Sequence, residues 1–127
     1  MTRQQWQALV DHAREDAPIE CCGYGYGRDG HVIEVVRAVN ERNSPYGFEL
    51  GFEPLRAAND FDDEGYEVFV YHSHPKSEPR PSQQDINIAL YPDWRYLIVS
   101  LADEQAPEVR AWRIAGGKVD EEEIEIG

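Results

Sequence analysis

The chain has 127 residues, of which 41% are hydrophobic and 11% aromatic, a composition that suits one folded domain and excludes a disordered chain. Its 25 acidic and 12 basic residues give a formal net charge of −13, which opposes binding to nucleic acid or to anionic lipid. No apolar run approaches the roughly 20 residues that span a bilayer, and the N-terminal residues lack the apolar region of a signal peptide, so we expect a cytoplasmic protein.

Apolar periodicity and turn residues divide the chain into helices and strands. Apolar residues at helical spacing predict a first helix from Thr2 to Asp16, and Gln5, three residues after Thr2, completes a capping box. Pro54 lies in the first turn of a second predicted helix, a position that tolerates proline. Helices are expected over residues 2–16, 53–63 and 82–90, and strands over residues 22–27, 31–40, 48–50, 67–74, 96–101, 109–114 and 119–126.

This pattern contains no internal repeat, low-complexity segment or linker. We therefore expect one α/β domain over residues 1–127, with a mixed, mostly antiparallel sheet flanked by helices. The two cysteines, Cys21 and Cys22, are adjacent, which excludes a disulfide framework and a cysteine-based zinc site. Both are expected to be small buried side chains.

The residues with the clearest chemistry lie between positions 68 and 90. Side chains alternate along a strand, so His72 and His74 point to one face if residues 67–74 form a strand. Asp85 lies in the first turn of the next predicted helix. Two imidazoles and a carboxylate that leave a fourth position open for water are a common ligand set of catalytic zinc. Ser82, near the same helix start, can donate its hydroxyl proton to an oxyanion.

Each part of this region also has a structural interpretation. Two histidines on a buried strand are often satisfied core residues, and Ser82 with Asp85 has the spacing of an ordinary capping box. The combination favours a metal site, because packing alone does not explain a buried histidine pair at a strand end beside a helix that opens with serine and aspartate.

The same region resembles the motif of the JAMM (MPN+) zinc metalloproteases, in which a distant glutamate precedes His-Ser/Thr-His, seven residues, a serine, two residues and an aspartate. His72-Ser73-His74, Ser82 and Asp85 have that spacing, and residues 18–23 (Pro-Ile-Glu-Cys-Cys-Gly) resemble the upstream segment of small prokaryotic members. The resemblance implies a single JAMM/MPN-like (cytidine-deaminase-like) domain. It also implies a Zn²⁺ ion held by His72, His74 and Asp85, with Glu20 as the general base and Ser82 as the oxyanion-stabilising hydroxyl.

A closer resemblance lies in the segment Asn40-Glu41-Arg42-Asn43-Ser44-Pro45 and in the aromatic Tyr46 and Phe48 that follow it. These residues are similar to those of small bacterial members that act on ubiquitin-like sulfur carriers. The implied function is that of a zinc-dependent isopeptidase or peptidase. Such a hydrolase cleaves the bond after the C-terminal Gly-Gly of a ubiquitin-like or sulfur-carrier protein and releases cysteine or another group.

Several alternatives stay open from the sequence. Without the resemblance, Glu34, Glu49 and Glu53 are candidates for the base alongside Glu20. A non-catalytic scaffold for a ubiquitin-like partner would keep the fold and lose the metal, and the intact ligand set argues against it. A nucleobase deaminase needs a His-x-Glu and a Pro-Cys-x-x-Cys that this chain lacks, and the net charge opposes a DNA-repair role.

Three properties are left open by the sequence: the conjugate that is cleaved, the metal used in the cell, and the oligomeric state, for which a homodimer is one option. Lys76 and Arg80, in the connection after His74, are candidates for contacting a carboxylate of the substrate. The alternative for both is a solvent-exposed loop.

Overall fold

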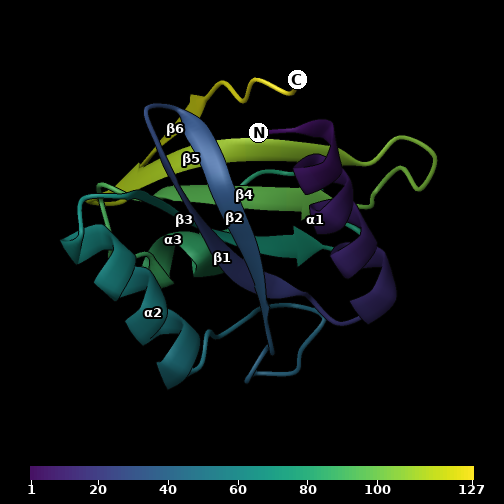
Figure 1. Cartoon of the computed structure of the whole chain (residues 1–127). Helices are drawn as coiled ribbons and strands as arrows, with labels where there is room; N and C mark the ends of the chain where they lie inside the picture. Colours follow the sequence, from purple (N-terminus) through teal and green to yellow (C-terminus); the bar gives the residue numbers. More distant parts are fainter.

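The computed structural model describes residues 1–127, and its helices lie on both faces of one six-stranded sheet (Figure 1). The elements in chain order are α1 (Arg3–Asp16), β1 (Cys22–Arg28), β2 (His31–Ala38), α2 (Phe52–Asp63), β3 (Glu67–His74), α3 (Gln83–Ile88), β4 (Arg95–Ser100), β5 (Glu108–Ala115) and β6 (Lys118–Glu122). The strand order is β2-β1-β3-β4-β5-β6, with β3 and β4 parallel and all other neighbours antiparallel. This confirms the expected mixed, mostly antiparallel sheet flanked by helices.

Local sequence signals account for most element boundaries. Thr2 caps α1, and both hydrogen bonds of its capping box with Gln5 are present, at 2.8 and 3.0 Å. The strand predicted over residues 67–74 is β3. β1 and β2 form a hairpin, and Asp29 and Gly30 in its turn adopt positive φ angles. None of the helices is long and apolar enough to cross a membrane.

Some predicted elements are shorter in the structure or absent from it. Residues 48–50 form no strand, because the N–H of Glu49 donates to the side chain of Asn40 (3.0 Å) and only an isolated bridge forms there. α3 ends at Ile88 rather than at position 90. Pro92 follows shortly after and disfavours helical backbone at Tyr91, so the helix does not continue.

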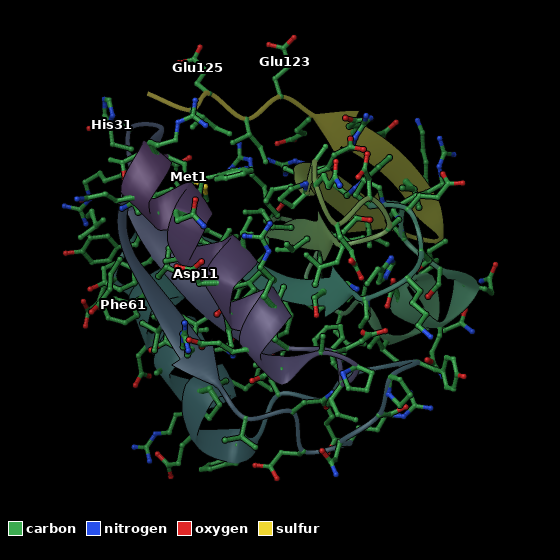
Figure 2. All side chains as sticks on the ribbon, turned by 90° about the vertical axis from the view of Figure 1, so that its right-hand side faces the viewer. Met1, Asp11, His31, Phe61, Glu123 and Glu125 are labelled. Atoms are coloured by element: carbon green, nitrogen blue, oxygen red, sulfur yellow. The ribbon has the colours of Figure 1, made fainter.

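The last predicted strand is also shorter than expected, since β6 ends at Glu122. The residues that follow form hydrogen bonds with the start of the chain instead. One of these runs from the N–H of Gly127 to the carbonyl of Met1 (3.1 Å). Figure 2 shows this segment near Met1, with the side chains of Glu123 and Glu125 pointing away from the sheet.

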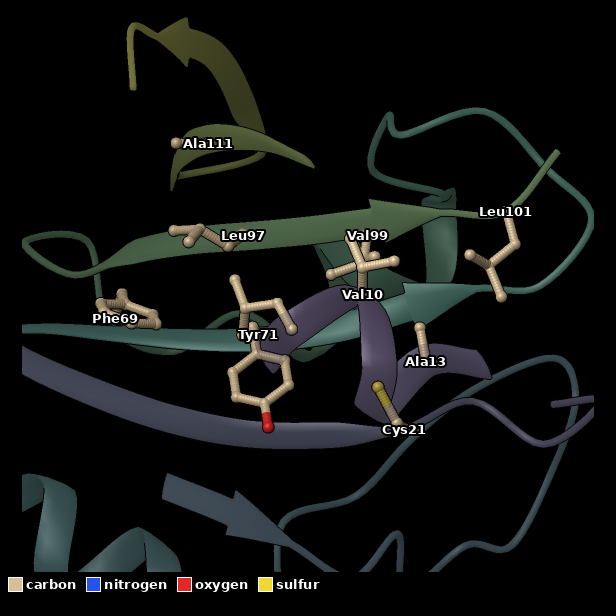
Figure 3. Close-up of a cluster of buried hydrophobic side chains, with 10 residues drawn as sticks. Val10, Ala13, Cys21, Phe69, Tyr71, Leu97, Val99, Leu101 and Ala111 are labelled. Atoms are coloured by element: carbon tan, nitrogen blue, oxygen red, sulfur yellow. The ribbon is translucent and has the colours of Figure 1, made fainter. Parts of the chain in front are cut away.

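β3 is buried on both faces and separates two apolar cores. On one face Phe69 and Tyr71 pack with residues of α1 (Figure 3). On the other face Val68 and Val70 pack in a cluster that contains residues of α2. His72 continues this second face, as the predicted alternation of side chains requires.

The pairing of β1 with β3 decides which residues meet at the end of the sheet. Cys22 lies opposite His72 in the antiparallel register. Just beyond, the N–H of Cys21 donates to Oγ of Ser73 (2.8 Å), and the N–H of Ser73 donates to the carbonyl of Cys21 (3.1 Å). These bonds bring Glu20, which is distant from the histidines in sequence, beside the end of β3.

Candidate metal centre

Three donor atoms converge at the end of β3. The Nε2 atoms of His72 and His74 lie 3.1 Å apart, and Oδ2 of Asp85 lies 3.2 Å from the first and 3.1 Å from the second. All three side chains are buried. In a tetrahedral zinc site with bonds of about 2.0–2.1 Å, the ligand atoms are about 3.3–3.4 Å apart. The three residues are therefore spaced as the ligands of one metal ion are.

Neighbouring groups fix the orientation of the two imidazoles. Nδ1 of His74 donates to the carbonyl of Glu78 (2.8 Å), so Nε2 is the ring nitrogen that faces His72 and Asp85. The ring of His72 stacks on Phe48, with ring centroids 4.4 Å apart. Burial lowers the pKa of His72, which favours the neutral imidazole that metals bind.

Asp85 has two roles at the start of α3. The N–H of Ser82 donates to Oδ2 of Asp85 (2.9 Å), and the N–H of Asp85 donates to Oγ of Ser82 (3.1 Å), so the predicted capping box is present. The same Oδ2 atom faces both histidines. Burial alone would raise the pKa of Asp85, but the hydrogen bonds with His72 and His74 hold this pKa far below its usual range. The carboxylate is therefore charged and able to bind a cation.

Glu20 supplies a second carboxyl group beside the histidines. A carboxylate oxygen of Glu20 and ring nitrogens of His72 and His74 all lie within 4.8 Å of one another. Only 5% of Glu20 is exposed, and its Oε1 atom has no hydrogen-bond partner. Burial raises the pKa of Glu20 to about 7. A carboxyl group of this kind both accepts and releases a proton at neutral pH.

A cavity of about 470 Å³ opens beside this candidate metal centre, and His72 and Asp85 form part of its wall. We call it the apolar cavity, because most of its other lining residues are hydrophobic. Arg42 and Glu49 are the other charged residues that line it. The apolar part of the wall includes Phe48, Leu50, Leu55, Ile88, Tyr91 and Tyr96.

The other glutamates that the sequence left open as bases lie elsewhere. Glu34 is on β2 and accepts a hydrogen bond from a tyrosine hydroxyl (2.8 Å). Glu53 is exposed in the first turn of α2. Glu49 lines the apolar cavity but is exposed to solvent. Glu20 is thus the buried glutamate that the fold brings together with the histidines.

Asn40 is a residue whose role the sequence did not reveal. Its buried side chain makes four hydrogen bonds of 3.0 Å: Nδ2 donates to the carbonyls of Glu20 and Gly47, and Oδ1 accepts from the N–H groups of Arg42 and Glu49. One side chain thereby joins the backbone at Glu20 to the segment that lines the apolar cavity. The polar run after β2 was the available signal, and such a run is typical of any loop.

The fold and this arrangement of side chains define the class of protein. Residues 2–115 match the family described as prokaryotic homologues of the JAB domain. The chain therefore belongs to this family, which confirms the predicted membership of a small prokaryotic JAMM/MPN family.

Individual relatives span most of the chain. The CysO-cysteine peptidase of Mycobacterium tuberculosis (strain ATCC 25618 / H37Rv) is 35% identical over 125 residues, which cover 94% of this chain and 84% of the relative. A desampylase of Pyrococcus furiosus is 30% identical over 111 residues, which cover 85% of this chain and 76% of the relative. The solution structure of protein DSY2949 from Desulfitobacterium hafniense matches with a TM-score of 0.81 at 36% identity, over 99% of this chain and 90% of that one.

We expect Asn40→Asp to destabilise the fold although it preserves the size of the side chain. An aspartate cannot donate to the carbonyls of Glu20 and Gly47, and it places a buried negative charge against them. The free energy of unfolding, measured by denaturant titration, should fall by about 2–4 kcal/mol.

The control for this substitution is Gln105→Glu, which makes the same change of charge at an exposed position between β4 and β5. It should alter the free energy of unfolding by less than about 0.5 kcal/mol. Equal stability of the Asn40→Asp and Gln105→Glu proteins would show that the four hydrogen bonds are dispensable.

Proposed function

We propose that this protein is a metal-dependent peptidase that cleaves the bond after the C-terminal Gly-Gly of a ubiquitin-like or sulfur-carrier protein. The observation that carries the proposal is the convergence of donor atoms from His72, His74 and Asp85 beside the buried carboxyl group of Glu20. The names of two relatives support the substrate class, because one is a CysO-cysteine peptidase and the other a desampylase.

In this proposal His72, His74 and Asp85 hold the metal ion, and their nitrogen and carboxylate donors suit Zn²⁺. When bound, such an ion acts as a Lewis acid that polarises a carbonyl group and makes water more acidic. Asp85 is assigned as the third ligand because its Oδ2 atom lies 3.1–3.2 Å from both histidine nitrogens and is fixed by the cap of α3. Glu20 keeps an unpartnered oxygen and is left for proton transfer.

Glu20 acts first as the general base and then as the general acid. It takes a proton from the attacking water, whose hydroxyl group joins the carbonyl carbon of the terminal glycine. It delivers this proton to the leaving nitrogen as the C–N bond breaks. A pKa of about 7 suits both transfers. The products are a carrier that ends in a glycine carboxylate and a released amine.

Ser82 stabilises the negative oxygen that develops at the attacked carbonyl group. Its Oγ atom accepts a hydrogen bond from the N–H of Asp85 (3.1 Å), so its own hydroxyl proton is free to donate. Ser82 is also exposed at the start of α3, where a substrate can reach it.

The first test is the metal content of the purified protein, measured by mass spectrometry. We expect about one zinc ion per chain, and less than about a tenth of that in Asp85→Asn, which keeps an acceptor for the cap of α3 but loses the charged ligand. Added zinc should raise the melting temperature of the native protein and not that of the variant. A native protein that binds no zinc after incubation with the metal would exclude the peptidase and favour a binding module.

We expect Glu20→Gln to keep its zinc and to hydrolyse CysO-cysteine about 10²–10⁴-fold more slowly, because the amide cannot take the proton from water. The matched control is Glu34→Gln, which removes the same charge from the solvent-exposed side of β2 and should turn over at the native rate. Normal turnover by Glu20→Gln would refute its role as the base.

Ser82→Ala should lower kcat by about 10²–10³-fold and leave KM nearly unchanged, because the lost donor acts on the developing oxyanion. Ser82→Thr keeps both the hydroxyl and the cap of α3 and should retain most of the activity. Steady-state kinetics and thermal unfolding of both variants check this. A Ser82→Ala protein that loses stability and keeps kcat would assign Ser82 to capping alone.

A further inference from the structure

Arg42 lies at the edge of the apolar cavity, to which His72 and Asp85 also belong. It is exposed to solvent, and its guanidinium makes no ion pair or hydrogen bond, since only its backbone N–H is bonded. The arginines that do form ion pairs are Arg37, Arg95, Arg110 and Arg113. In a chain with a net charge of −13, an arginine without a carboxylate partner beside the proposed reaction centre is available to a ligand.

The surrounding backbone leaves room for this guanidinium. A side-chain carbon at Gly47 would overlap Nη1 of Arg42 and would lie 2.6 Å from Oε1 of Gln84. The missing side chain therefore provides the space that the guanidinium occupies beside α3. Asn40 fixes the backbone on both sides of this space, because it bonds to the N–H of Arg42 and to the carbonyl of Gly47.

The two cations that the sequence suggested for a substrate carboxylate do not line the apolar cavity. One of them, Arg80, lies over the ring of Trp112 instead (5.8 Å).

We propose that Arg42 binds the α-carboxylate of the amino acid that the reaction releases; this inference rests on the proposed function. An amino acid joined through its α-amino group to Gly-Gly carries a free carboxylate next to the bond that breaks. A lysine joined through its ε-amino group carries no such charge there. The planar guanidinium of arginine binds a carboxylate through two parallel hydrogen bonds. Arg42 thus selects carrier–amino acid conjugates over lysine-linked ones.

The test compares two substrates that differ in one group: the CysO carrier with cysteine added at its C-terminus as the free acid, and the same conjugate as the carboxamide. The native enzyme should cleave the acid with a kcat/KM at least about tenfold higher. Arg42→Gln should lose this preference through a higher KM for the acid, and should cleave the amide within about twofold of the native rate. Arg42→Lys should restore part of the preference.

The control is Arg56→Gln, which removes the same charge from an exposed position on α2 outside the apolar cavity. It should show the native preference for the acid. Equal cleavage of acid and amide by the native enzyme would overturn the inference and leave the proposed function standing.

Cleavage of neither conjugate would instead contradict the proposed function, and binding then decides the inference separately. Calorimetry with the zinc-loaded Glu20→Gln variant measures the Kd of each conjugate without turnover. Tighter binding of the acid that disappears in the Glu20→Gln, Arg42→Gln double variant supports a carboxylate site. Equal affinities for acid and amide would disprove it.

Discussion

The paired hydrogen bonds between Cys21 and Ser73 are the contact on which the centre depends. They extend the pairing of β1 with β3 past the last ladder position, where Cys22 faces His72. Side chains alternate along β3, so His72 and His74 point to the face opposite Ser73, whose side chain and backbone make this contact. The carboxyl group of Glu20 and the two imidazoles thus come together from segments about 50 residues apart in sequence.

Grouping Glu20, His72, His74 and Asp85 in one buried place opposes stability, since ionisable groups lose hydration there. Part of this cost is offset by hydrogen bonds from the cap of α3 and from the backbone at Glu78. The rest of this cost is not offset, because Oε1 of Glu20 and Nδ1 of His72 have no hydrogen-bond partner. Buried polar atoms without hydrogen-bond partners, inside an otherwise well-packed domain, are typical of functional sites.

The sequence predicted the parts of the structure that depend on short-range patterns. Alternation along β3 placed both histidines on one face, and the spacing of Ser82 and Asp85 predicted the cap of α3. The roles of Asn40 and Arg42 were not predictable in this way. Both roles depend on which distant segments the sheet brings together. The identity of a polar loop residue does not indicate those contacts. The segment at 48–50 was mistaken for a strand because an asparagine side chain, rather than a neighbouring strand, takes its hydrogen bond.

The shared use of Asp85 by the cap of α3 and by the proposed metal site has a thermodynamic consequence. α3 has six residues, too few to hold a helix together without contacts from outside. Its local opening removes Oδ2 from the histidines, so helix formation and ligand binding at this position are linked. An ion that binds at Asp85 disfavours local opening of α3 and so slows hydrogen exchange along the helix. Because the two equilibria are linked, the ion binds the opened helix more weakly by the same factor. The stability of this six-residue helix would therefore set, through Asp85, how tightly the proposed site holds a metal ion.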